Sequence, residues 1–117
     1  MQVLINTDSH VNADPGLLYQ VESEVVSTLA RFSDQLTRVE VHLSDQNAGR
    51  GGAENMRCML EARPAGRKPV AVTHVAATIE EAASGAGNNL ASLLDTTFGR
   101  TAARRGRDSI RHPADPL

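Results

Sequence analysis

Two stretches of alternating apolar and polar residues constrain the fold of this chain more than any other feature. Within residues 36–44 the apolar side chains Val39, Val41 and Leu43 occupy every second position, and residues 54–63 repeat this spacing. A period of two predicts a β-strand that buries one face. The glycine-rich segment NAGRGGAE lies between the two stretches, so we expect them to form a hairpin with a long loop.

Two further strands are predicted on either side of this hairpin. Residues 2–7, QVLINT, are short, apolar and β-branched, and turn-forming residues follow them. Residues 70–77, VAVTHVAA, come after the tight reversal PAGRKP. The sequence therefore predicts four strands.

Two segments have the apolar spacing of a helix. In residues 15–32 apolar side chains recur every three or four positions, with Asp14 as a candidate N-cap and a proline at the first helical position. The second helix is predicted to begin at the capping box TIEE, residues 78–81. Gly85 and Gly87 lie inside it, and we expect close packing against the sheet to compensate for their low helix propensity.

The predicted order is β-α-β-β-β-α, an α+β fold. A four-stranded, mostly antiparallel sheet with both helices packed on one face buries every apolar stripe at once. The first helix supplies the crossover that lets the first strand pair in parallel with its neighbour. Because the chain has 117 residues and only 3% aromatic residues, we expect one domain with a small, aliphatic core.

Cysteine content and hydropathy indicate the compartment. The single cysteine, Cys58, alternates with apolar neighbours, which predicts a buried and inert thiol. One cysteine cannot form an internal disulfide and is compatible with a reducing environment. No apolar run approaches the length of a membrane span and the first residues lack a signal-peptide pattern, so we expect a cytoplasmic protein.

Charge is distributed unevenly along the chain. Residues 100–117 contain five arginines and two aspartates, a net charge of +3, so residues 1–99 hold −5 of the total of −2. We therefore expect a folded, acidic body in residues 1–99 and a basic, disordered tail in residues 100–117. A basic tail favours a polyanionic partner, although a tail that only improves solubility is the alternative. The candidate phosphate contacts in the tail are Arg100, Arg104, Arg105 and Arg107.

The element order and one specific stretch resemble a known family. The stretch is FSDQLTRVEV, residues 32–41, in which an aromatic residue at a helix exit is followed by a short polar turn and an alternating strand. Over residues 1–98 the chain resembles the ribosome hibernation factors, the family of the hibernation-promoting factor and the ribosome-associated inhibitor. The resemblance implies binding to the small ribosomal subunit through ribosomal RNA phosphates and inhibition of translation on idle ribosomes.

The resemblance also implies where the RNA contacts lie. Members of this family typically carry Lys and Arg on the final helix, whereas this chain has no basic residue between Lys68 and Arg100. We interpret the tail arginines as a relocated basic helix end; if the second helix continues past residue 99, Arg100, Arg104 and Arg107 share one of its faces. Arg67 and Lys68 in the second hairpin turn and Arg31 at the exit of the first helix are weaker candidates. The structural explanation for Arg67 and Lys68 is an ordinary charged turn, and that for Arg31 is a favourable interaction with the helix dipole.

A different class of function is compatible with the same residues. The acidic body and the missing basic helix favour a protein-interaction module that has lost ribosome binding, for example a homodimer formed through an exposed sheet edge.

An enzyme is not expected, because the sequence shows no paired acid and base and no cofactor motif. His42 and His74 lie on strands that could bring them together, but they lack metal-ligand spacing and are expected to be structural. The arginines of the outward sheet face alternate with Glu40 and Glu61, which predicts cross-strand ion pairs rather than a basic surface.

Overall fold

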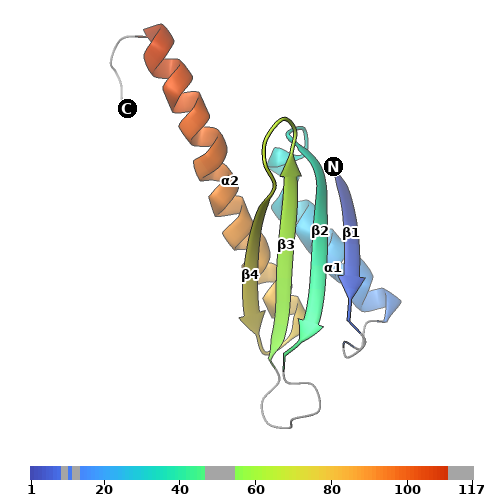
Figure 1. Cartoon of the computed structure of the whole chain (residues 1–117). Helices are drawn as coiled ribbons and strands as arrows, with labels where there is room; N and C mark the ends of the chain where they lie inside the picture. The colour runs from blue at the N-terminus through green and yellow to red at the C-terminus, as the bar shows by residue number, and fades with distance from the viewer. Residues whose placement is uncertain (9–10, 12–13, 47–54, 111–117) are drawn as a thin grey trace.

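The computed structural model describes the backbone of residues 1–8, 11, 14–46 and 55–110, and the side chains of these residues up to Gly99. The α+β class and the predicted order β-α-β-β-β-α are confirmed (Figure 1). The elements are β1 (Gln2–Thr7), α1 (Pro15–Thr28), the 3-10 turn η1 (Ala30–Phe32), β2 (Leu36–Asp45), β3 (Met56–Pro64), β4 (Val70–Ala76) and α2 (Ile79–Ile110).

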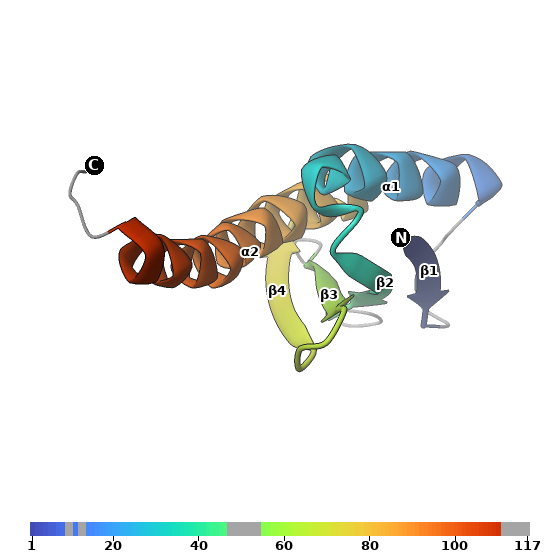
Figure 2. The same ribbon diagram turned by 90° about the horizontal axis from the view of Figure 1, so that it is seen from above.

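The four strands form one sheet in the order β1-β2-β3-β4. β1 pairs with β2 in parallel, and the other two pairings are antiparallel, as the sequence predicts. Both helices lie on the same face of this sheet (Figure 2). The register places Val41 opposite Ile5 on one side and Leu60 on the other, so the apolar positions of neighbouring strands align under the helices.

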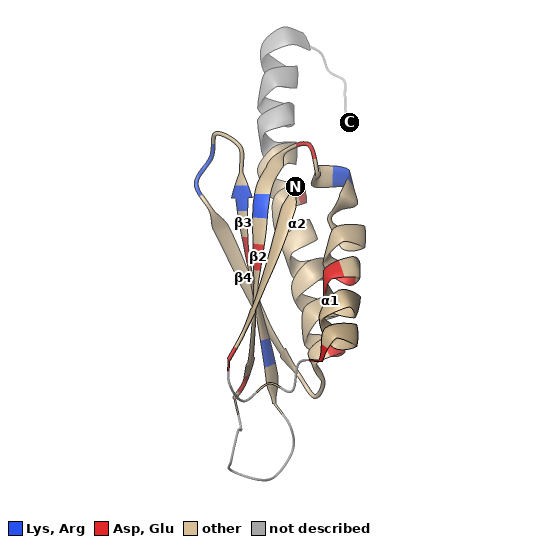
Figure 3. Ribbon diagram, turned by 90° about the vertical axis from the view of Figure 1, so that its right-hand side faces the viewer, with Lys and Arg blue, Asp and Glu red and all other residues tan. Residues whose placement is uncertain are grey.

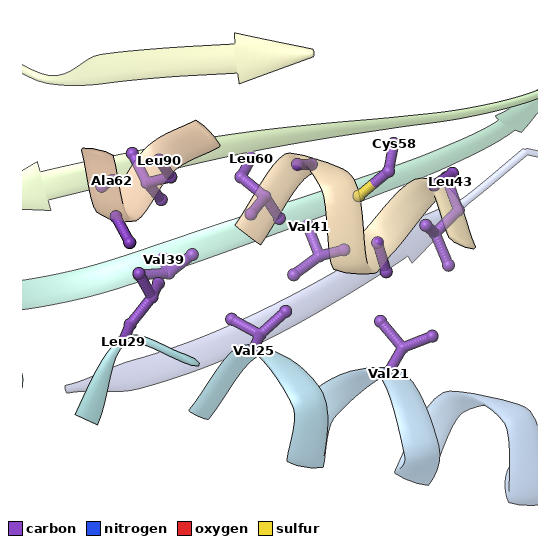
Figure 4. Packing of buried hydrophobic residues seen from close by; sticks show 14 of the residues in the cluster. Val21, Val25, Leu29, Val39, Val41, Leu43, Cys58, Leu60, Ala62 and Leu90 are labelled. Atoms are coloured by element: carbon purple, nitrogen blue, oxygen red, sulfur yellow. The ribbon is translucent and has the colours of Figure 1, made fainter. Parts of the chain in front are cut away.

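The core lies between the sheet and the two helices and is almost entirely aliphatic. Val21, Val25 and Leu29 point from α1 toward the apolar residues of β2 (Figure 4). The α2 stripe adds small residues that let this helix approach the sheet closely. The buried apolar residues are Val11, Val21, Val25, Leu29, Phe32, Leu36, Val39, Val41, Leu43, Cys58, Leu60, Ala62, Ile79, Ala82, Ala83, Ala86, Leu90, Ala91 and Leu94.

The first helix is shorter than its apolar pattern suggests. It begins as predicted, with the Asp14 carboxylate accepting a 2.8 Å hydrogen bond from the Leu17 amide, but it ends at Thr28 rather than at residue 32. The chain then tightens into η1, where the Phe32 amide donates to the Leu29 carbonyl at 2.9 Å. This tighter turn satisfies the last carbonyls and directs the Phe32 ring, which is 5% exposed, into the core.

The second helix begins at the predicted cap and is longer than its apolar stripe. The Thr78 hydroxyl accepts a 3.1 Å hydrogen bond from the Glu81 amide. The helical backbone then passes through Gly99 and ends at Ile110, so this part of the predicted tail is helical in its backbone. Residues 111–117 lie outside the described residues, and the division of the chain at residue 99 stays a prediction. In the part of the chain that the structure describes, none of the helices has the length and apolarity needed to cross a membrane.

The two histidines of the described strands do not approach one another. His42 points to the outer face of β2, where it lies beside Glu40, whereas His74 points from β4 toward α2. A Cβ atom built on Gly85 would overlap the His74 imidazole, with the ring Cγ only 2.7 Å away. Gly85 is therefore the point where α2 rests directly on an edge strand, which explains a glycine in the middle of a helix.

The buried thiol predicts a specific pH dependence of stability. Burial raises the pKa of Cys58 from 9.0 to about 12, because the thiolate would lose its hydration in the aliphatic core. The stabilisation is therefore complete below about pH 9, where the unfolded thiol is still neutral, and it is lost as the pH rises toward 12. Between about pH 9 and about pH 12 we expect the free energy of unfolding, measured by chemical denaturation, to fall more steeply in this protein than in Cys58→Ala. Parallel pH profiles of the two proteins would contradict the prediction.

Candidate nucleic-acid interface

Two phenylalanine rings join α2 to the exit of α1 at one end of the sheet. Phe32 comes from η1 and Phe98 from α2, with ring centroids 5.9 Å apart and ring planes tilted by 37°. Phe98 packs against the edge of the core that contains Phe32. This pair fixes the exit of α1 against the last packed turn of α2, just before the helix continues beyond Gly99.

Two of the predicted basic residues lie over these rings. The Arg31 guanidinium carbon is 4.4 Å from the Phe32 centroid, and that of Arg67 is 5.1 Å from the Phe98 centroid. Lys68 follows Arg67 in an exposed turn. Figure 3 shows the blue segments of this turn and of the α1 exit at the same end of the molecule. The structure thus brings together the three weaker candidates, which are far apart in the sequence.

The backbone of the β3–β4 connection places Arg67. Gly66 has a φ of 74°, and the Arg67 amide donates to the Pro64 carbonyl at 3.3 Å, which closes a four-residue turn. Residues with a side chain rarely adopt this φ, so the turn depends on glycine at this position. The predicted tight reversal is confirmed, and it places Arg67 and Lys68 beyond the end of β3 and before the start of β4.

Arg31 has a partner that the sequence does not indicate. Its guanidinium forms a two-pronged ion pair with the carboxylate of Asp95 on α2, and the second prong, from Nη2 to Oδ2, is 2.8 Å long. The hydrogen bond between the two groups raises the pKa of Arg31 and lowers the pKa of Asp95. Asp95 therefore compensates much of the Arg31 charge, and Arg31 is a weaker phosphate contact than its exposure suggests.

The strongest predicted contacts lie on the continuation of α2. Arg100, Arg104, Arg105 and Arg107 all belong to its helical backbone; we call residues 100–107 the arginine segment. The side chains of this segment lie outside the described residues. In Figure 1, α2 extends beyond the sheet at the end where the β3–β4 turn lies. Because the backbone is helical here, the spacing of Arg100, Arg104 and Arg107 places these three positions on one face of α2.

Groups that could support catalysis are sparse among the described residues. The Cys58 thiol is buried and protonated at neutral pH. A small hollow between α1 and α2 is lined by Gln20, Val21, Glu24, Glu80 and Ala83. It offers two carboxylates but no histidine, lysine or cysteine. The basic end of the fold, with its arginine-covered rings, is therefore the strongest candidate for a binding surface.

Several solved structures share the fold of this chain. The N-terminal domain of Protein Y from Thermus thermophilus superposes with a TM-score of 0.65 at 18% identity, over 83% of this chain and 99% of that domain. A ribosomal subunit interface protein from Coxiella burnetii superposes with a TM-score of 0.67 at 10% identity, over 85% of this chain and 99% of that one. No family model and no curated protein matches the sequence. At these identities the likeness establishes a shared fold.

Proposed function

We propose that this protein binds the small ribosomal subunit through phosphates of ribosomal RNA and inhibits translation by occupying its surface, as a hibernation factor would. The observation that carries the proposal is the continuation of α2, as helix, through the arginine segment at the end of the fold where Arg67 and Lys68 lie. The fold shared with a ribosomal subunit interface protein supports the same conclusion.

The chemistry of the basic end favours phosphate over base recognition. Arginine binds phosphate oxygens with two parallel N–H donors, and each such contact releases counterions from the RNA. Phe32 is buried, and the Phe98 ring is covered by the Arg67 guanidinium, so neither ring is available for stacking on a base. We therefore infer binding that depends strongly on salt and little on sequence.

The acidic body gives the complex an orientation. Residues 1–99 carry a net charge of −5, and RNA repels a surface of this sign. The protein consequently approaches RNA with the basic end first. This separation of charge accounts for an acidic protein that carries an arginine segment.

Co-sedimentation with purified small subunits, in low and in moderate salt, tests the proposal. We expect binding in low salt that weakens steeply as salt increases, and inhibition of a cell-free translation reaction by the same protein. If the protein stays at the top of the gradient in low salt, the ribosomal function is wrong. The alternative would then be the protein-interaction module, which the acidic body and the compensated Arg31 favour. Its partners would be proteins whose binding changes little with salt concentration.

The ion pair between Arg31 and Asp95 yields a further prediction. Asp95→Asn removes the carboxylate that compensates Arg31, so affinity for small subunits is expected to rise severalfold, and the salt dependence to steepen by about one charge equivalent. Glu24→Gln on α1 is the control, because it changes the net charge equally without touching Arg31. Binding titrations at several salt concentrations measure both quantities. Equal behaviour of the two folded variants would show that Arg31 does not contact RNA.

A further inference from the structure

The outer face of the sheet, which neither of the described α-helices covers, holds two carboxylates directly opposite one another. The register pairs Glu40 on β2 with Glu61 on β3, and their side chains are 19% and 29% exposed. Like charges at opposed positions of neighbouring strands repel, so this arrangement needs positive charge close by. Arg38 and Arg63 supply that charge on one side of the pair.

The two oxygens of Glu40 face different groups. Oε2 lies 2.9 Å from Nη2 of Arg38 and 3.9 Å from Nε of Arg63. Oε1 lies on the other side, 3.4 Å from Nε2 of His42. Arg63 also approaches Glu61, with Nη2 3.6 Å from Oε1. The arginines therefore contact one oxygen of Glu40, and the imidazole contacts the other.

The spacing on the imidazole side fits a metal ion. Two ligand atoms bound to one tetrahedral zinc ion at its usual bond lengths are separated by about 3.3 Å. The 3.4 Å between Nε2 of His42 and Oε1 of Glu40 matches this separation. Glu61 offers a third ligand atom, and the three atoms all lie within 4.8 Å of one another. When the proton of the neutral imidazole is on Nδ1, Nε2 and the carboxylate oxygen both present lone pairs across this gap, so a cation between them can bind both.

We propose that Glu40, His42 and Glu61 form a binding site for a divalent transition-metal ion of the zinc class. An imidazole nitrogen with two carboxylate oxygens is a donor set that such ions accept, with water in the fourth position, whereas Mg²⁺ and Ca²⁺ prefer oxygen ligands alone. The positive charge of Arg38, which lies against the far oxygen of Glu40, repels a cation bound to the near oxygen. Removing this charge in Arg38→Gln therefore increases the affinity for zinc, while loss of a ligand lowers it.

Calorimetric titration of the full, chelator-treated chain with Zn²⁺ tests the site. We expect one ion per chain, a higher melting temperature with zinc than without, and no comparable binding of Mg²⁺. Glu61→Gln and His42→Gln should each weaken binding by at least about tenfold, and Arg38→Gln should strengthen it severalfold. Glu24→Gln, which removes one negative charge from α1, should bind zinc like the unmodified protein.

Two results would overturn the proposal. One is the absence of saturable Zn²⁺ binding by the folded protein. The other is binding that survives both Glu61→Gln and His42→Gln, because the ion would then lie elsewhere. Far-UV circular dichroism of each variant establishes that it is folded, and these half-buried side chains lie outside the hydrophobic core cluster. The test is independent of ribosome binding, so it separates this site from the proposed function.

Discussion

Replacing all four arginines of the arginine segment with glutamine is expected to lower affinity for small ribosomal subunits by about a thousandfold near physiological salt. Each arginine that contacts a phosphate releases close to one counterion, so four contacts contribute about three to four units to the slope of log affinity against log salt. The quadruple variant should lose this part of the slope. Fluorescence anisotropy of the labelled protein over a salt series measures affinity and slope together.

A matched pair of single variants separates local contact from net charge. Arg107→Gln and Arg57→Gln change the charge equally, but Arg57 belongs to β3, on the outer face of the sheet. We expect Arg107→Gln to reduce the salt slope by about one unit and Arg57→Gln to leave it nearly unchanged. A quadruple variant that retains the original slope would place the RNA contacts outside the arginine segment.

Gly85→Ala is expected to destabilise the fold by about 2 kcal/mol, whereas Gly87→Ala should be neutral or stabilising by up to about 1 kcal/mol. Both substitutions improve helix propensity equally. The difference comes from the surroundings, since the new methyl group overlaps the His74 ring at position 85 but only reaches ordinary contact with Thr28 Cγ2, 3.4 Å away, at position 87. Urea denaturation of the three proteins gives the comparison.

A second substitution tests the cause of this loss. His74→Ala makes room for the methyl group, so the double variant Gly85→Ala/His74→Ala should lose less stability than the two single effects predict together. Additive effects would mean that the imidazole is not the obstacle. Equal stability of Gly85→Ala and Gly87→Ala would contradict the close approach of α2 to β4.

Much of the fold follows from local sequence patterns. Alternation identifies β2 and β3, and the side chains of Asp14 and Thr78 mark the helix starts because each satisfies an amide of the first turn. The end of α1 was predicted wrongly, because the apolar pattern continues to Phe32 while the backbone changes to the tighter turn after Thr28. Periodicity reports which face is buried and does not distinguish these two kinds of turn.

The pairings that shape the candidate sites are mostly long-range. Arg31 and Asp95 are 64 positions apart, and no local pattern links them. Glu61 comes opposite Glu40 only through the register of the hairpin, so spacing along one strand could not reveal a ligand set divided between two strands. The placement of Arg67 could be anticipated as a charged turn, but its contact with Phe98 depends on the path of α2.

The length of α2 also bears on the kinetics of helix formation. A helix begins with a costly first turn, and short isolated helices are only marginally stable in water. In this chain the first turns of the 32-residue α2 are held by Thr78 and by packing on the sheet, so residues beyond Gly99 extend an existing helix one hydrogen bond at a time. The arginine segment therefore becomes helical without a nucleation step of its own.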